Sequence, residues 1–252
     1  MKKNSGYKRT PLIKNIKNYT KSALRQDISN MIKYGKSAPR YAEELWIRPE
    51  ECMRFIPYNF FINCGILKKG DKMRANSGKV HSGFWPTESA IHIHTAMSDE
   101  FAFEDYSNND TPGFVSLFKF RACYNHWVKG LSWNETGIYD YHLFCIKKFE
   151  RPVDHGCLTK ADIVSRYDRL DVIFSDIQRE GRFKNPYELG RSNFRGRRGI
   201  YIHIGPNGEV FWGQGGQHRF AMAHILNLPF PAMLGVTDVS SISTLKELRH
   251  RS

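Results

Sequence analysis

The segment spanning residues 200–236 constrains the fold more than any other part of the chain. Isoleucines alternate with other residues over 200–204, which is the two-residue period of a β-strand with one buried face. The Asn-Gly pair at 207–208 then predicts a tight hairpin turn, and residues 209–212 predict the returning strand. We therefore expect an antiparallel hairpin here.

A glycine-rich loop connects this hairpin to a predicted helix. The loop reads Gly-Gln-Gly-Gly-Gln-His-Arg over residues 213–219, and helix-forming residues continue to Leu228, just before Pro229. Glycines let a backbone approach a ligand closely, and the amino end of a helix presents amide groups and a positive dipole. The loop therefore predicts an anion site, with phosphate as the natural ligand. Residues 232–236 predict one further buried strand.

These motifs resemble the ParB/sulfiredoxin superfamily. In that superfamily a strand hairpin leads into a Gly-x-His-Arg or Gly-x-Arg-Arg loop, and the helix after the loop holds a nucleotide phosphate at its amino end. Residues 166–181 resemble the helix that precedes the hairpin, and residues 245–249 resemble the tail of a poorly characterised ParB-like group. The resemblance covers residues 151–252 and implies an α+β, ParB/sulfiredoxin-like domain with a small mixed sheet and flanking helices.

The loop residues distinguish this chain from individual members of the superfamily. Gln217 replaces the nucleophilic cysteine of sulfiredoxins, and an amide cannot attack a sulfinyl phosphate. The free-serine kinases match at Gly216, His218 and Arg219, but they have an aspartate where this chain has Gly215. ParB proper adds a DNA-binding helical domain, for which we expect the remaining sequence to be too short.

The resemblance implies a nucleotide-dependent phosphotransferase that uses ATP or ADP, with CTP as an alternative, together with Mg²⁺. The residues expected to hold the nucleotide phosphates are Gly215, Gly216, Gln217, His218 and Arg219. Phosphoryl transfer also requires a carboxylate that assists the metal or the acceptor hydroxyl. Asp154 is the candidate, because the ParB-like group has a similar Val-Asp pair before its first helix. Asp154, His218 and Arg219 are therefore the expected catalytic residues, and Asp154 the expected Mg²⁺ ligand.

Other assignments of these residues stay open. Arg219 can pair with a local carboxylate while His218 caps the helix. The alternative carboxylates are Asp168, Asp171, Glu180 and, more weakly, Asp238. Acids on such a helix mostly form a solvated face, so each of these is more simply a surface residue.

A basic segment separates the predicted helix from the hairpin. Residues 182–198 contain six Lys or Arg and a single acid, interleaved with aromatic residues and glycines. Because this segment cannot neutralise itself, it should attract a polyanion. We expect Arg197 and Arg198 to cover a bound nucleotide, and a solvent-facing loop without a ligand is the alternative.

Positive charge is concentrated at the N-terminus. The chain has a formal net charge of +13, and residues 1–40 contain eleven Lys or Arg against Asp27 alone. Apolar residues recur every three to four positions over residues 12–32, which predicts a basic amphipathic helix. Such a helix can lie on an anionic membrane, bind nucleic acid, or pack its apolar face on the rest of the chain.

We divide the chain into a basic N-terminal segment at 1–40, a region of strands, loops and short helices at 41–150, and the domain at 151–252. The middle region should fold against the C-terminal domain. Within it, apolar runs at 91–94 and 114–118 predict short strands.

The hydropathy of the sequence predicts the cellular location of the protein. We find no run of eighteen apolar residues, and residues 1–20 lack the apolar core of a secretory signal. We therefore expect a cytoplasmic protein, with peripheral contact at the inner face of the membrane through residues 12–32.

Two further groups of residues are of types that take part in metal or redox chemistry. His92 and His94 would face one side of a strand and could bind a transition metal, with a third ligand from His81, His126 or His142, although such alternation is ordinarily a strand's wet face. The five cysteines form no Cys-x-x-Cys pair, which predicts reduced, partly buried residues. They are Cys52, Cys64, Cys123, Cys145 and Cys157.

Three functional hypotheses follow. The first is a kinase-type phosphotransferase acting on a hydroxyl of a small molecule or glycan, for which a lipid-linked glycan would suit the basic N-terminus. The second is a ParB-like nucleic-acid-binding protein or nuclease that responds to nucleotide. The third is a scaffold that has lost catalysis, as Gly215 in place of the superfamily aspartate would allow.

Overall fold

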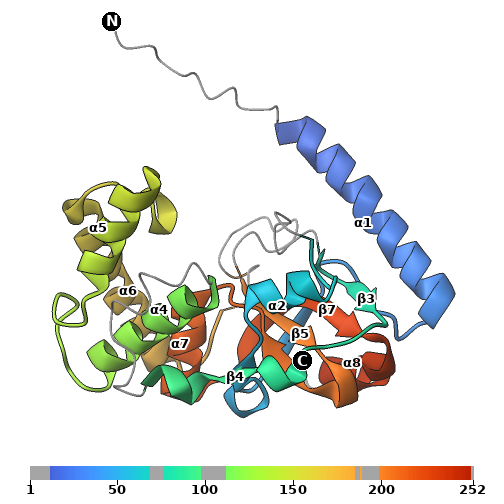
Figure 1. The fold of residues 1–252 in the computed structure, drawn as a ribbon. Coiled ribbons are helices and arrows are strands. Elements are labelled where there is room, and N and C mark those ends of the chain that lie inside the picture. The colour runs from blue at the N-terminus through green and yellow to red at the C-terminus, as the bar shows by residue number, and fades with distance from the viewer. Residues whose placement is uncertain (1–11, 69–75, 98–111, 185–187, 189–198, 251–252) are drawn as a thin grey trace, which may run out of the picture.

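The computed structural model describes residues 12–68, 76–97, 112–184, 188 and 199–250. The helices are α1 (Leu12–Tyr34), α2 (Tyr58–Asn63), α4 (Pro112–Trp127), α5 (Ile138–Phe149), α6 (Lys160–Glu180), α7 (Gln217–Leu226) and α8 (Ile242–His250). The strands are β1 (Glu44–Ile47), β2 (Arg54–Phe55), β3 (Lys79–His81), β4 (Ile91–His92), β5 (Ile200–Ile204), β6 (Val210–Trp212) and β7 (Phe230–Asp238). The described chain is thus a mixed α+β structure (Figure 1).

The described strands form one mixed sheet in the order β1-β7-β5-β6-β2-β4, with β3 also pairing with β7. Strands β5 and β7 are parallel, with Tyr201 opposite Met233, whereas β5 and β6 form the predicted antiparallel hairpin. Strands β1 to β4 come from residues 44–92, so the middle and C-terminal regions of the sequence share one sheet.

The hairpin, loop and helix follow the sequence closely. Asn207 and Gly208 adopt φ values of 60° and 77°, the left-handed conformation that a tight Asn-Gly turn requires. Helix α7 covers Gln217–Leu226 and is followed by Asn227, the C-cap residue, which has a φ of 52°. Strand β5 differs from the prediction in one respect, because both of its faces are buried. Ile200, Ile202 and Ile204 belong to the larger apolar cluster, while His203 contacts Phe61 of the smaller cluster, so side chains cover both faces of this strand.

The run at 114–118 was wrongly predicted as a strand, because it lies within helix α4. This helix is buried on several sides, as the buried side chains of Leu117, Phe118 and Phe120 show. Its own apolar residues are therefore not confined to one face, and the sequence has no clear helical period there. The run at 91–94 forms a strand only at Ile91–His92, after which the chain continues as a 3₁₀ helix.

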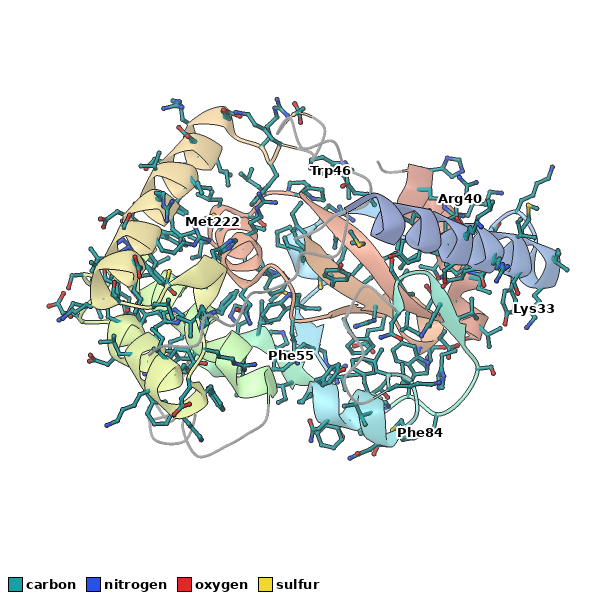
Figure 2. All side chains as sticks on the ribbon, turned by 90° about the horizontal axis from the view of Figure 1, so that it is seen from above. Lys33, Arg40, Trp46, Phe55, Phe84 and Met222 are labelled. Carbon is teal, nitrogen blue, oxygen red and sulfur yellow. The ribbon has the colours of Figure 1, made fainter. Side chains whose placement is uncertain are left out.

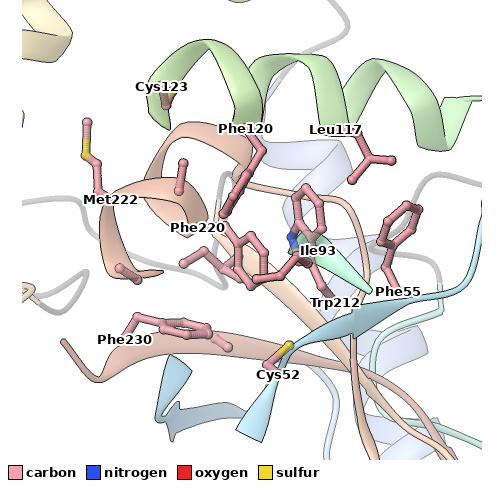
Figure 3. Packing of buried hydrophobic residues seen from close by; sticks show 14 of the residues in the cluster. Cys52, Phe55, Ile93, Leu117, Phe120, Cys123, Trp212, Phe220, Met222 and Phe230 are labelled. Atoms are coloured by element: carbon pink, nitrogen blue, oxygen red, sulfur yellow. The ribbon is translucent and has the colours of Figure 1, made fainter. Parts of the chain in front are cut away.

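Aromatic side chains fix helices α4 and α7 on the sheet (Figure 3). The ring of Trp212 stacks on Phe220 of α7 with centroids 4.2 Å apart, and Phe220 in turn contacts Phe120 of α4 at 5.9 Å. On the opposite face, Phe211 stacks against Trp85 at 6.4 Å. Because neighbouring residues of β6 serve opposite faces, the hairpin is held by two separate groups of apolar side chains.

Helix α1 lies at one end of the molecule, and helices α5 and α6 lie at the other (Figure 1). In the part of the chain that the structure describes, no helix combines the length and the apolar character needed to cross a bilayer. The five cysteines are all unpaired, and four of them are buried, as the sequence predicted.

Candidate functional site

Four helices and one turn bring a group of polar side chains together next to the amino end of α7. We call this group the polar cluster. Its members are Lys119 of α4, His142 of α5, Asp154 of the turn before α6, Arg166 and Tyr167 of α6, and His218 of α7.

The turn that carries Asp154 is held in place by local contacts. After α5 the chain forms a short 3₁₀ turn over Asp154–Gly156, in which His155 has a φ of 67° and Gly156 a φ of 99°. A bridge between Val153 and Cys157 closes the turn. Helix α6 then starts with a capping box, in which the amide of Thr159 donates to Asp162 Oδ2 at 2.9 Å and the amide of Asp162 donates to Thr159 Oγ1 at 3.2 Å. Asp154 is therefore fixed directly before the first turn of α6.

An ion pair joins Asp154 to Lys119. The Lys119 Nζ contacts Asp154 Oδ1, and the two side chains are only 9% and 16% exposed. Burial alone would raise the pKa of Asp154, but the Lys119 ammonium holds that pKa well below its usual range. Asp154 is therefore a carboxylate at neutral pH.

Tyr167 links the two histidines of the polar cluster. Its hydroxyl lies 2.9 Å from His142 Nε2 and 3.2 Å from His218 Nε2. Asp154 Oδ2 lies 3.2 Å from His142 Nε2 and 3.8 Å from His218 Nε2. Burial lowers the pKa of His142, and it lowers the pKa of His218 to about 3, so both rings are uncharged at neutral pH.

One assignment of protons satisfies this arrangement. His142 Nε2–H donates to the Tyr167 hydroxyl, and the Tyr167 hydroxyl donates to His218 Nε2. The protonated nitrogen of His218 is then Nδ1. A continuous path of hydrogen bonds thus runs from His142 through Tyr167 to the first turn of α7.

The polar cluster has an excess of positive charge. With both histidines neutral, the cationic side chains of Lys119 and Arg166 outnumber the single carboxylate of Asp154. Among the described residues, Arg166 Nε, His142 Nδ1 and Asp154 Oδ2 are buried without a hydrogen-bond partner. Buried atoms of other residues, among them Trp85 Nε1, also lack such a partner, so these atoms by themselves do not mark a site.

The glycines before α7 have a different explanation from the predicted one. A Cβ atom on Gly215 would lie 2.6 Å from Cδ2 of Tyr201, and one on Gly216 would lie 2.8 Å from the amide nitrogen of Ile200. Gly216, which caps α7, also has a φ of 66°. The loop needs these glycines because its backbone packs directly on β5. This packing fixes the direction in which the amino end of α7 points.

The structure brings together two of the three predicted catalytic residues, Asp154 and His218. Gly215 and Gly216 form the end of the loop, and Gln217 and Arg219 lie with His218 in the first turn of α7. Arg197 and Arg198, predicted to cover a nucleotide, lie outside the described residues.

Lys119, Arg166 and Tyr167 were not predicted from the sequence, and His142 was predicted only as a possible metal ligand. One signal was present for Lys119, which is the single cation in the apolar run from Phe114 to Phe120. A buried helix that contains one lysine usually provides it with a partner.

The alternative carboxylates either bind neighbouring groups of the fold or lie exposed on its surface. Asp171 accepts hydrogen bonds from the indole nitrogens of Trp127 at 2.9 Å and Trp133 at 3.0 Å. Glu180 accepts a bond from Lys184, Asp238 caps the turn after β7, and Asp168 is exposed. Within the described residues, none of these four carboxylates forms a hydrogen bond or an ion pair with the polar cluster.

The predicted metal ligands do not assemble. No group of three or more His, Cys, Asp or Glu residues within the described ranges is arranged to hold a metal ion. His92 and His94 stack on each other with centroids 5.0 Å apart, whereas His142 belongs to the polar cluster. Around Asp154 the described partners are an ammonium and two imidazoles, and this set does not fit Mg²⁺, which requires oxygen ligands.

No family model matches this chain, and comparisons with curated proteins and with solved structures find no match. The resemblance to the ParB/sulfiredoxin superfamily therefore stays a prediction, carried by the loop and hairpin residues themselves.

Proposed function

We propose that this protein binds a nucleotide through its terminal phosphates at the amino end of α7 and transfers a phosphoryl group to a hydroxyl. One observation carries the proposal: a buried cluster with surplus positive charge lies against the uncapped start of a helix. Both the helix dipole and the surplus charge favour an anion with several oxygens.

Each residue has a distinct role in this proposal. Arg219 and the amides of the first turn of α7 hold the phosphates, and Arg166 supplies a second guanidinium from α6. Lys119 keeps Asp154 charged and neutralises part of the phosphate charge. His218 presents no positive charge of its own, because its ring is buried and uncharged at neutral pH.

The transfer step follows from these roles. The acceptor hydroxyl donates a hydrogen bond to Asp154 Oδ2, the oxygen that lacks one in the described structure. Its oxygen forms a bond to the terminal phosphorus as the bond between that phosphorus and the leaving diphosphate oxygen breaks. Asp154 orients the hydroxyl and does not keep its proton, because its pKa is far below neutral, so the proton passes to water. No step is assigned to Mg²⁺, since the donors around Asp154 do not fit it.

Calorimetric titration of the full chain with ATP, ADP and CTP tests the binding step. We expect at least one nucleotide to bind, and Arg166→Gln and Arg219→Gln each to weaken that binding by about tenfold. Arg169→Gln is the matched control, because Arg169 is exposed on α6 and its Nε donates a hydrogen bond to the carbonyl oxygen of Ser165. Equal affinity in all four proteins would remove the proposed clamp.

Nucleotide hydrolysis, with water as the surrogate acceptor, tests the transfer step. Asp154→Asn keeps the shape of the side chain but removes its charge. We expect this variant to bind nucleotide and to lose most of its slow hydrolysis. A variant that hydrolyses ATP as fast as the unchanged protein would show that Asp154 has no part in transfer.

A further inference from the structure

Helix α1 is attached to the rest of the molecule along one side of its C-terminal half. Asn30 Nδ2 donates to the carbonyl oxygens of Pro39 at 2.7 Å and Gly78 at 2.8 Å, and Gln26 Nε2 donates to the carbonyl oxygen of Ser77 at 2.7 Å. Ala23 is buried on the same side. These bonds hold the orientation of α1, which extends from there away from the sheet (Figure 1).

A different side of the same helix carries a row of exposed apolar side chains. Leu24, Ile28, Met31 and Ile32 are 61%, 44%, 55% and 76% exposed, respectively. Their spacing of three and four residues places them on one face of the helix. We call this row the apolar stripe. Single exposed apolar residues are ordinary, but a continuous row of them indicates a surface that is covered by a partner.

Cations flank the apolar stripe. Lys21 and Arg25 are exposed on α1 beside Leu24 and Ile28, one helical turn apart. At the base of the helix, Lys36 and Arg40 line a groove of about 360 Å³ together with Ile28 and Met31 of the stripe. Figure 2 shows Arg40 and Lys33 at this end of the molecule.

The acids near this surface are bound within the domain, and the carboxylate of Glu43 accepts from the backbone amide of Arg40 at 3.0 Å and from Arg249 at 2.9 Å. Asp27 also lines the groove, but its Oδ1 accepts a hydrogen bond from the backbone amide of Tyr41 at 2.6 Å. It is the only acid in residues 1–40, where eleven Lys or Arg are found. The surface around the apolar stripe therefore combines apolar side chains with net positive charge.

We propose that α1 docks this surface on a lipid bilayer that contains anionic headgroups. The apolar stripe enters the boundary between headgroups and acyl chains, and Lys21, Arg25, Lys36 and Arg40 contact the headgroup phosphates. A bilayer matches both parts of the surface. A second copy of the chain would bring the same cations against each other, and nucleic acid would leave the apolar stripe in water.

Co-flotation of the full chain with vesicles tests this inference. One set of vesicles is phosphatidylcholine alone, and the other contains about one third phosphatidylglycerol, which gives a negative surface. We expect binding to the anionic vesicles only, and weaker binding as salt concentration rises. This result does not depend on nucleotide binding at α7, because the two surfaces share no residue.

Two variants separate the contributions of the stripe and the cations. Leu24→Gln/Ile28→Gln/Met31→Gln removes the apolar contact while keeping good helix formers, and we expect it to abolish flotation. Lys21→Gln/Arg25→Gln should weaken binding by about 25-fold, because each cation near an anionic surface contributes about fivefold. Val172→Gln/Ile173→Gln is the control, since these exposed apolar residues of α6 are 62% and 39% exposed and should not affect flotation.

Three outcomes would overturn the proposal. The unchanged protein could fail to float with anionic vesicles. Light scattering could show a dimer that the stripe variant loses, in which case the stripe binds a second copy of the chain. Finally, the stripe variant could float as well as the control while melting at the same temperature, which would leave the apolar side chains without a role at the membrane.

Discussion

The carboxylate of Asp154 faces the imidazole of His218, with Oδ2 lying 3.8 Å from Nε2. Asp154 precedes α6, whereas His218 follows the β5–β6 hairpin, so only the folded chain brings them together. Lys119 holds the other oxygen of the same carboxylate. The cluster is therefore a structural unit as well as a candidate site, and its removal should affect stability.

Lys119→Met should destabilise the protein strongly. The substitution leaves the carboxylate of Asp154 buried without its ammonium partner, which typically costs about 3 kcal/mol or more of the free energy of unfolding. Urea denaturation at pH 7 measures the change. Lys147→Met is the control, because Lys147 is exposed on α5 and its loss should change stability by less than about 0.5 kcal/mol. Equal stability of the two variants would contradict the buried ion pair.

Stability should fall as the pH falls from 6.5 toward 4.5. Burial lowers the pKa of His218 from 6.5 to about 3, so in this range the unfolded chain binds more protons than the folded one. His203 and His224, whose pKa burial lowers to about 4, act in the same direction. Denaturant unfolding at several pH values measures the slope.

His218→Asn should make that slope shallower, whereas His250→Asn, at an exposed position of α8, should not change it. Protonation of Asp154 lowers the free energy of unfolding further, but only at lower pH. Its folded pKa is depressed, so its contribution is complete above the unfolded value of about 3.9 and is lost below it. An unchanged slope in the His218 variant would mean that this ring is not buried uncharged.

Gly216→Ala should cost more stability than Gly181→Ala. The two glycines have φ values of 66° and 64°, so both substitutions carry the same left-handed strain of about 1 kcal/mol. Only at Gly216 does the new Cβ also meet the backbone of β5, at 2.8 Å from the amide nitrogen of Ile200. We expect roughly 2 kcal/mol of additional loss from this crowding. Equal melting temperatures for the two variants would contradict the close packing of the loop.

Asp171→Ala should destabilise α6 against α4. It removes the acceptor for the indole nitrogens of Trp127 and Trp133, which costs about 2 kcal/mol. Unfolding followed by tryptophan fluorescence measures both stability and the change around the indoles. Asp168→Ala, one turn away at an exposed position, should leave both unchanged. If both variants behave alike, the carboxylate of Asp171 does not hold the indoles.

The sequence by itself determined the elements whose signals are local. The Asn207-Gly208 turn, the strands on either side of it, and helices α1 and α7 were predicted from period, turn residues and caps, whereas α6 was expected from the resemblance and only from residue 166 onward. Each of these signals concerns the backbone conformation of a few neighbouring residues, so it can be recognised in the sequence without knowledge of any tertiary contact. Asp154 and His218 were proposed as site residues from the resemblance, and that role stays a prediction.

Only the tertiary structure decided which side chains meet. Helix α4 is surrounded by apolar neighbours, which erased the periodicity of its sequence and led to the wrong strand prediction. Lys119 comes from α4, whereas Arg166 and Tyr167 are consecutive residues of α6, and no spacing rule connects them with His218. These side chains come together because the helices pack on the sheet. Their electrostatic interactions become strong only there, since the packed segments exclude water from around the charged groups.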